Sequence, residues 1–589
     1  MYSQTDKPLF VNKIAILGGN VELEVKARSL LRLKEQRFLS KMQFDQRLLK
    51  LDAISLKTLY VSKGYLSVSV KDSFQISEDR VNIFLIISEG KQYFLKSVDV
   101  SGNNLIDDNT IAKTLGLKVN KPYNPVRANT NLPNLESIYH EIGHLFATFS
   151  VKDEIKDSVY VNINITEHKS VRINRVLWDG IGNLDSNIVQ REMAFNVNEI
   201  YKKSKIDLTQ QRLLKTGIFS SANFIPLGIA GTDTSINILV ELKQFKHREW
   251  ISEGGYYPIE YYEGAEPVPG AGLNLEWRVR RLWWTSTSFS NKISSHALLV
   301  DGSLIPKIRF EMNMSNQWLL SFRIPTQIET FYEYFKDFGI NNKPYVSRYG
   351  IHLFNIYQID EKSFIETGLE WEKFIRPSQS TIELTNSKRV NIQKRSMLAH
   401  ILIDKSDHPL YPRKGNTYSM ILNKTGGILG GNRDFFKMDL GLTSYSSMRE
   451  IVFAGQLKIG KIYGWSSDYR DYQYDLFYLG GSTSLRGWDM LRFNVDENKN
   501  PKGNISRIMA NAEIRFPLFW VLGGEVFTDG GYLADSFSKF SLSQLEWDAG
   551  GGITLITALG PVRLDFAAPV DDFTHFRKWK IQLGVHYLF

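Results

Sequence analysis

Cysteine is absent from this chain of 589 residues. Without it the chain can form no disulfide, no thiolate metal site and no lipobox. The sequence also has no run of about 18 apolar residues, which excludes transmembrane helices. No basic-then-apolar leader follows Met1, so we expect that any export signal has been removed or replaced. The chain contains no P-loop, dinucleotide fingerprint or Gly-x-Ser-x-Gly elbow, and it therefore predicts neither a cofactor nor an enzymatic activity.

Charge of one sign is not concentrated anywhere in the sequence. The net charge of +9 arises from 72 basic and 63 acidic residues, which are spread along the chain in mixed-sign pairs. No block of Lys or Arg marks a nucleic-acid-binding face. The charges therefore predict a solvated surface and no nucleic-acid partner. The length predicts several domains, because a single core rarely serves more than about 200 residues.

The first 246 residues contain a repeat, in which three glycines recur at separations of roughly 75–80 residues. Each glycine follows an apolar helical pattern and precedes an alternating strand pattern. Each repeat also opens with a short alternating strand that ends in a glycine turn. The glycines are Gly64, Gly143 and Gly217, and the opening strands are Lys13–Asn20, Ser97–Asn104 and Arg175–Asn183. The pattern predicts three β-α-α-β-β modules.

These modules resemble POTRA domains, with boundaries at residues 9–91, 92–169 and 170–246. The resemblance implies a periplasmic arm whose exposed strand edges pair with extended client chains, a binding mode called β-augmentation. It also implies that the arm contacts an inner-membrane or periplasmic partner protein. The alternative reading is that the three modules are structural spacers.

One metal-binding motif lies inside the second module, where His140, Glu141 and His144 form an H-E-x-x-H match. A zinc peptidase needs both histidines on one face of a continuous helix. Here Gly143 is expected to end the helix, because glycine adopts the left-handed conformation after a helix at no steric cost. The two imidazoles should therefore diverge, and the sequence predicts no metal site.

Residues 247–589 alternate apolar with polar or small residues in segments of about ten, separated by turn-rich stretches. Examples are "SRYGIHLFNIYQI" and "IVFAGQLKIGKIYG", and aromatic residues cluster at segment ends such as "FYEYF". This is the pattern of a transmembrane β-barrel with interfacial aromatic girdles. Sixteen antiparallel strands would have about 21 residues each, enough to cross the bilayer and turn. A soluble β-sandwich also alternates, but it would not explain the terminal Phe589 on an aromatic strand.

The C-terminal half resembles the Omp85 superfamily at several positions. "DKSDHPLYPRKGNTYSM" (Asp404–Met420) is similar to its Asp…Pro-x-x-Gly strand entry, "VFTDGG" (Val526–Gly531) to its Phe-x-Asp-x-Gly strand, and "GPVRLDFAAP" (Gly560–Pro569) to its penultimate strand. "LRGW", from Leu485 to Trp488, is similar to the family's Arg-Gly-Phe/Tyr loop, although Trp replaces the usual aromatic residue. The resemblance implies an outer-membrane barrel with the arm in the periplasm.

The resemblance further implies that the Arg-Gly loop folds into the barrel lumen and that Arg486 pairs there with Asp529, close to Gly531. Such an arginine loses water, so it needs a carboxylate in bidentate geometry. Gly487 allows close approach of the backbone, and Trp488 is expected to stack on the wall or on the cation.

Within the superfamily, three POTRA copies resemble a TamA-type translocation and assembly subunit. The implied function is assembly of unfolded outer-membrane or secreted client proteins in the outer-membrane bilayer. Clients would enter through a lateral seam between the first strand, with Gly254 and Gly255, and a last strand that includes Tyr587 and Phe589. The alternatives are a dedicated secretion pore of the two-partner type and a truncated central barrel-assembly insertase.

Overall fold

The computed structural model describes residues 9–35, 42–228, 234–260, 262, 265–282, 285–300, 303–337, 344–377, 389–466, 473–519, 521–538, 540–557, 560–572 and 578–589. The chain divides into two compact units. The first comprises residues 1–214 and 219–243, and the second comprises residues 215–218 and 244–589. Within the described ranges, no helix has the length and apolar character that a bilayer crossing requires.

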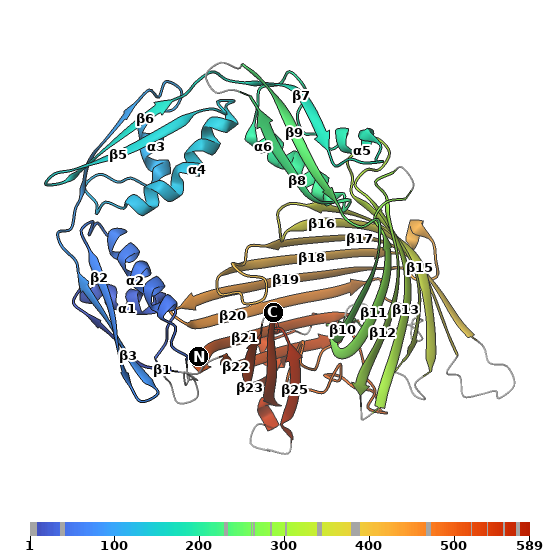
Figure 1. The fold of residues 1–589 in the computed structure, drawn as a ribbon. Helices are drawn as coiled ribbons and strands as arrows, with labels where there is room; N and C mark the ends of the chain where they lie inside the picture. The colour runs from blue at the N-terminus through green and yellow to red at the C-terminus, as the bar shows by residue number, and fades with distance from the viewer. Residues whose placement is uncertain are drawn as a thin grey trace, which may run out of the picture. The chain divides into compact units, whose positions relative to one another are not determined.

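The first unit contains three sheets of three strands with helices beside them (Figure 1). The first set is β1 (Phe10–Leu17), α1 (Val21–Leu30), α2 (Gln46–Val61), β2 (Ser69–Ser77) and β3 (Arg80–Ser88). The second is β4 (Leu95–Ser101), α3 (Asp108–Leu115), α4 (Pro125–Glu141), β5 (Thr148–Ile155) and β6 (Val159–Thr166). The third is β7 (Arg172–Asp179), α5 (Ser186–Gln190), α6 (Lys203–Lys215), β8 (Phe219–Leu227) and β9 (Ser235–Gln244). The element order is β-α-α-β-β each time.

The three sheets share one topology, in which the last strand of each set lies between the other two. In the second set, Leu135 and Tyr139 of α4 are buried with Val159 and Val161 of β6 in one apolar core. Helical spacing on α4 and alternation on β6 put these side chains on facing surfaces. The three repeat glycines all have positive φ, at +90°, +93° and +71°. A β-carbon at Gly143 would approach Ile200 Cγ2 to 2.5 Å, so the turn requires glycine there.

The second unit is an antiparallel sheet of sixteen strands that follow one another in chain order and curl into a nearly closed barrel. The prediction of POTRA repeats followed by a sixteen-stranded barrel is confirmed. The strands are β10 (Arg248–Ile259), β11 (Val268–Val279), β12 (Ser288–Val300), β13 (Ser303–Asn316), β14 (Thr326–Lys336), β15 (Tyr345–Gln358), β16 (Phe364–Pro377), β17 (Arg389–Asp404), β18 (Gly415–Thr425), β19 (Phe435–Met448), β20 (Ile451–Tyr463), β21 (Ser506–Phe519), β22 (Leu522–Ala534), β23 (Glu546–Thr557), β24 (Gly560–Pro569) and β25 (Lys580–Val585). Short 3₁₀ turns lie at Gly427–Leu429, Leu542–Gln544 and Val570–Asp572.

The alternation in the sequence corresponds to the two faces of this wall. On β16, Leu369 is half exposed, whereas Glu372 is buried among charged partners. Successive side chains of a strand point to opposite faces, so residues of odd number on β16 face lipid and residues of even number face the lumen. The barrel therefore has an apolar exterior and a charged interior.

The end of the last strand differs from the prediction. β25 ends at Val585, so Tyr587 and Phe589 lie beyond it. His586 has a φ of +69°, which turns the chain out of the strand direction. The Tyr587 ring then lies 3.8 Å from the Arg515 guanidinium carbon, and Arg515 Nη2 donates to the Phe589 carbonyl at 3.1 Å. Because Arg515 is buried on the lumen side of β21, the C-terminal residues occupy the lumen and not the seam.

A nearly closed barrel resists unfolding by detergent alone, because neighbouring strands are hydrogen-bonded all the way from β10 to β25. We expect the protein to migrate faster on a semi-native gel when unboiled than when boiled. Equal mobility, together with helical circular dichroism, would contradict the barrel.

Candidate functional site

The connection between β20 and β21 folds inside the barrel. We call its described part, residues 473–505, the lumen loop. Its side chains form an apolar cluster with inward residues of the wall, and Tyr478, Leu479 and Leu485 are fully buried in that cluster. Two successive glycines, Gly480 and Gly481, have φ of +112° and +103° and let the chain reverse. The turn is closed by a hydrogen bond from Gly481 N–H to the Leu485 carbonyl at 3.0 Å.

The turn presents Arg486 to the carboxylate of Asp529 on β22. Arg486 Nε donates to Asp529 Oδ2 and Nη2 donates to Oδ1, both at 2.8 Å, and both residues are completely buried. The Arg486 backbone N–H also donates to Oδ2, at 3.2 Å. The structure therefore brings these two sequence-predicted residues together in the bidentate geometry that a desolvated guanidinium requires.

Three further wall residues lie close to the Arg486 guanidinium. Nη1 donates to Glu513 Oε1 at 2.7 Å and to Glu525 Oε1 at 3.4 Å. The guanidinium carbon lies 3.3 Å from the centroid of the Phe527 ring, a cation–π contact. Sequence reasoning missed all three, although Glu525 and Phe527 share the face of Asp529 because they precede it by four and two residues on one strand.

The other predicted loop residues fill space around this pair. Gly487 N–H donates to Asp548 Oδ2 at 2.7 Å, and a β-carbon at Gly487 would approach Asp548 Cβ to 2.5 Å. Gly531 makes room for Leu485, since a β-carbon there would lie 2.4 Å from Leu485 Cδ1. These two positions therefore allow the loop to lie against the wall without a gap.

The aromatic partner of the Arg486 cation is Phe527 of the wall. The Trp488 ring packs edge-to-face on Phe493, with centroids 5.0 Å apart, while Phe527 covers the guanidinium. The sequence predicts that Trp488 stacks on the wall or on the cation, whereas its ring contacts Phe493 of the loop itself.

The barrel has a seam between β10 and β25, because the sheet begins at one strand and ends at the other and no ladder joins them in the described residues. Gly254 and Gly255 lie on β10, opposite Leu273 and Gly272 of β11. Both glycines are exposed, and Gly255 has a φ of +144°. Glycine weakens a strand because it adds no side-chain packing and loses more entropy on ordering.

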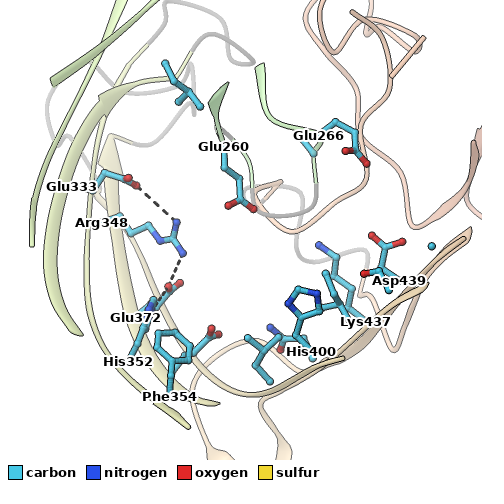
Figure 2. Close-up of a pocket in the computed structure, with 18 of the residues that line it drawn as sticks. Glu260, Glu266, Glu333, Arg348, His352, Phe354, Glu372, His400, Lys437 and Asp439 are labelled. Atoms are coloured by element: carbon cyan, nitrogen blue, oxygen red, sulfur yellow. Dashed lines mark hydrogen bonds and ion pairs between the residues drawn. The ribbon is translucent and has the colours of Figure 1, made fainter. Parts of the chain in front are cut away.

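The lumen also holds a cavity of about 560 Å³ lined by charged side chains (Figure 2). Arg348 contacts Glu372 at 2.5 Å and Glu333 at 3.8 Å, and Lys307 contacts Glu333 at 3.0 Å. Figure 2 shows Glu333, Arg348 and Glu372 along one wall of this cavity. Among the described residues, no group of three or more His, Asp or Glu side chains is arranged to hold a metal ion.

The H-E-x-x-H match in the first unit does not lie on one helix. α4 ends at Glu141, so the predicted helix end before His144 is confirmed. Burial lowers the pKa of the His140 imidazole, whose ring packs edge-to-face on Tyr201. His144 Nδ1 lies 3.1 Å from the backbone carbonyl oxygens of Glu167 and His168. Glu141 accepts hydrogen bonds from the backbone and side chain of Ser204. The three side chains of the motif therefore have separate partners.

Two family models match parts of this chain. A family model described as "Omp85 superfamily domain" matches residues 306–585, and a POTRA model described as "Surface antigen variable number repeat" matches residues 93–168. The chain is 22% identical to the outer membrane protein assembly factor BamA of Nitratidesulfovibrio vulgaris, over 96% of this chain and 71% of that protein. It is 20% identical to the BamA of Neisseria meningitidis serogroup B, over 92% of this chain and 73% of that protein.

A solved structure shares the fold. The crystal structure of BamA from Haemophilus ducreyi lacking POTRA domains 1–3 superposes with a TM-score of 0.60 at 13% sequence identity. The match covers 84% of this chain and 98% of that chain.

Arg486→Ala should lower the free energy of unfolding by about 3–5 kcal/mol, because it leaves buried carboxylates without their cation. Arg486→Lys should also destabilise the loop, since an ammonium cannot bind a carboxylate in the same fork geometry. Denaturant unfolding in lipid or detergent measures both effects. A double-mutant cycle with Asp529→Ala should give a clear coupling energy.

The matched control is the exposed pair of Lys405 and Asp360, whose removal should change stability far less because solvent screens it. Absence of coupling between positions 486 and 529 would remove the claim that this pair anchors the loop.

Proposed function

We propose that this chain, an Omp85 superfamily protein of the outer membrane with POTRA domains in the periplasm, is an assembly factor that inserts or translocates client proteins at the seam of its barrel. The observation that carries the proposal is the pair of edges at β10 and β25, which share no ladder within the described residues. Strand edges carry unpaired backbone N–H and C=O groups that another extended chain can pair with. The backbone of a client strand could therefore form hydrogen bonds to the edge of β10 or β25 before the client leaves the barrel.

The POTRA units supply further edges of the same kind. In each sheet the last strand is central, so the two outer strands, such as β1 and β2, each have one edge turned away from the sheet. These edges support the proposal that unfolded outer-membrane or secreted chains are received by β-augmentation. An inner-membrane or periplasmic partner protein would bind the same arm.

We propose more finely that the chain acts as a TamA-type subunit. The three β-α-α-β-β sets of the described chain support this assignment. Both curated relatives compared above are named outer membrane protein assembly factor BamA, which supports the wider reading of an assembly factor. Both readings describe insertion through a seam and lead to the same experiments.

We propose the seam and not the lumen as the route for clients. The lumen loop fills the inside of the wall with buried aromatic and apolar side chains, among them Phe477, Tyr478 and Leu485. A dedicated secretion pore would have to displace that loop and break the buried contacts of Arg486 with Asp529. Opening at the seam leaves those contacts in place.

A disulfide across the seam should stop client assembly. The native chain has no cysteine, so introduced thiols can react only with each other. A scan that pairs position 254 or 256 with position 583 or 585 should find a pair that crosslinks under oxidation, which requires Cα atoms within about 7 Å. Assembly of a model barrel protein in proteoliposomes should fail in the crosslinked protein and return on reduction.

The control is a disulfide between Leu369→Cys and Met397→Cys, which lie opposite each other on the paired strands β16 and β17. It should leave assembly unchanged. Full activity with the seam bridge closed would mean that clients pass another way, and it would favour the secretion pore.

Depletion of the protein from cells separates the two function classes. An assembly factor supports many clients, so quantitative proteomics of the outer membrane should show a general loss of β-barrel proteins. Loss of a single exported protein, with the barrel proteins unchanged, would identify a dedicated pore.

A further inference from the structure

The lipid face of the barrel carries an exposed cation beside an apolar groove. Arg395 of β17 is exposed, whereas its neighbours Lys394 and Ser396 are buried on the lumen side. We propose that this groove binds one anionic lipid of the outer leaflet, with the lipid phosphate at Arg395 and an acyl chain in the groove. The inference goes beyond the proposed function and does not depend on it. The site lies on β15 to β18, in the middle of the sheet, and not at the edges β10 and β25.

Strand direction places the groove on the extracellular side of the barrel. β10 follows the last POTRA strand directly in the chain, so it begins at the periplasmic end of the wall. Neighbouring strands are antiparallel and follow chain order, so β16 runs in the same direction as β10 and β17 runs back (Figure 1). Trp371 lies in the second half of β16 and Arg395 in the first half of β17, which is the extracellular half of both strands.

Aromatic rings place Arg395 at the depth of the lipid headgroups. Trp371 lies directly opposite Arg395, and the Tyr349 ring of β15 packs edge-on against Trp371 with centroids 6.0 Å apart. Trp and Tyr side chains gather at the membrane–water interface. A guanidinium on the lipid face costs far less at that depth than at the bilayer midplane, and the phosphates of membrane lipids lie at the same depth.

The groove extends from this aromatic row toward the bilayer centre and has a volume of about 390 Å³. Glu370 also borders it, but strand alternation turns that side chain to the lumen, where it lines the charged cavity. Hydrocarbon surrounds this part of the wall, so an acyl chain is the group that fills the groove. The apolar side chains of the groove are Ile351, Leu353, Leu369, Trp371 and Leu429.

One side of the groove is formed by the connection between β18 and β19, which folds back along β17. β18 pairs with β17 only as far as Thr425. Beyond that point, Gly426 N–H donates to the Arg395 carbonyl at 2.9 Å and Asn432 N–H donates to the Gln393 carbonyl at 3.0 Å. The connection therefore continues the hydrogen bonding along β17 and holds its own 3₁₀ turn beside the lipid face.

The 3₁₀ turn orients the cation and adds apolar surface. Arg395 Nη1 donates to the Leu429 carbonyl at 3.2 Å, and no Asp or Glu of the described chain forms an ion pair with this guanidinium. Arginine has five N–H donors in a planar fork, so donors remain for two phosphate oxygens. Ile428, at the tip of the turn, is fully exposed. Contact with lipid removes this apolar side chain from water.

The charge around the groove selects an anionic headgroup. Lys373 lies opposite Gln393 on the same face, and it is the diagonal neighbour of Arg395 because Trp371 lies opposite Arg395. Diagonal neighbours on one face are about 7–8 Å apart, a spacing that two long side chains bridge by binding one phosphate. A zwitterionic headgroup would bring its own cation next to Lys373 and Arg395. A headgroup with net negative charge is therefore favoured.

Native mass spectrometry of the intact protein tests the site, with dioleoyl phosphatidylglycerol and dioleoyl phosphatidylcholine as probes. The protein is released from detergent micelles that contain both lipids in equal amounts, and the lipids that stay bound are counted. The unmutated protein should retain one phosphatidylglycerol in preference to phosphatidylcholine. Inorganic phosphate in excess should not displace this lipid, because the acyl chain contributes to binding.

Two variants separate the cation from the groove. Arg395→Gln should lower the preference for phosphatidylglycerol about tenfold, because charge-assisted hydrogen bonds to the phosphate are lost. Leu369→Trp should lower the amount of retained phosphatidylglycerol although Arg395 is still present, because the larger ring fills the groove.

Matched controls make the corresponding changes elsewhere on the lipid face. Lys461→Gln removes a cation of β20 that donates to Ser506 Oγ at 2.6 Å and to the Asp535 carbonyl at 3.1 Å. Leu440→Trp enlarges a side chain of β19 that is 37% exposed. Both controls should retain the two lipids as the unmutated protein does.

Gel mobility before and after boiling verifies that each variant still forms a barrel. Equal retention of the two lipids by the unmutated protein would overturn the proposal, as would an unchanged preference in Arg395→Gln. An equal loss in the controls would mean that the lipid face attracts anionic lipids without a site, which also overturns it. Displacement by inorganic phosphate would show that the headgroup alone binds and would overturn the acyl-chain site.

Discussion

The burial of one guanidinium group is the constraint on which the lumen of this barrel depends. Arg486 has no exposed surface, so the wall around it must replace the water that it has lost. It does so with Asp529, Glu513 and Glu525, which come from two neighbouring strands. The lumen loop can therefore take only the position at which all these contacts form together.

The excess of carboxylates around Arg486 is balanced by two further arginines. Arg515 binds Glu513 at 2.6 Å, and Arg563 binds Asp565 at 2.7 Å and Glu525 at 3.4 Å. Each cation thereby shares acidic partners with the next, and the group extends from β21 to β24. Arg563 also donates to the Ser482 carbonyl of the loop and to the His586 carbonyl beyond β25. The same ionic group thus positions the loop, the wall and the C-terminal turn.

A second constraint is the edge of the sheet. In a bilayer, backbone groups at an open edge have no water to bind, so a seam is tolerated only where other parts of the protein cover it or another chain pairs with it. Here β25 has only six residues, and within the described chain it pairs with β24 alone. The three-stranded sheets of the first unit likewise have two outer strands, each with one edge outside the sheet.

The sequence alone determined the features that depend on local periodicity. Alternation predicted a barrel of strands, and the chain length was compatible with sixteen of them. The recurring glycines predicted the modules, because a positive φ at Gly64, Gly143 and Gly217 is a local requirement. The likeness of "LRGW" and "VFTDGG" to family motifs predicted the pairing of Arg486 with Asp529.

Tertiary structure alone decided that Glu513 and Phe527 also contact Arg486, because strand alternation shows which face a residue occupies but not what lies across the lumen from it. For the same reason, only the folded barrel placed Tyr262 on Tyr478, about 200 residues apart in the chain, and turned Tyr587 and Phe589 away from the seam.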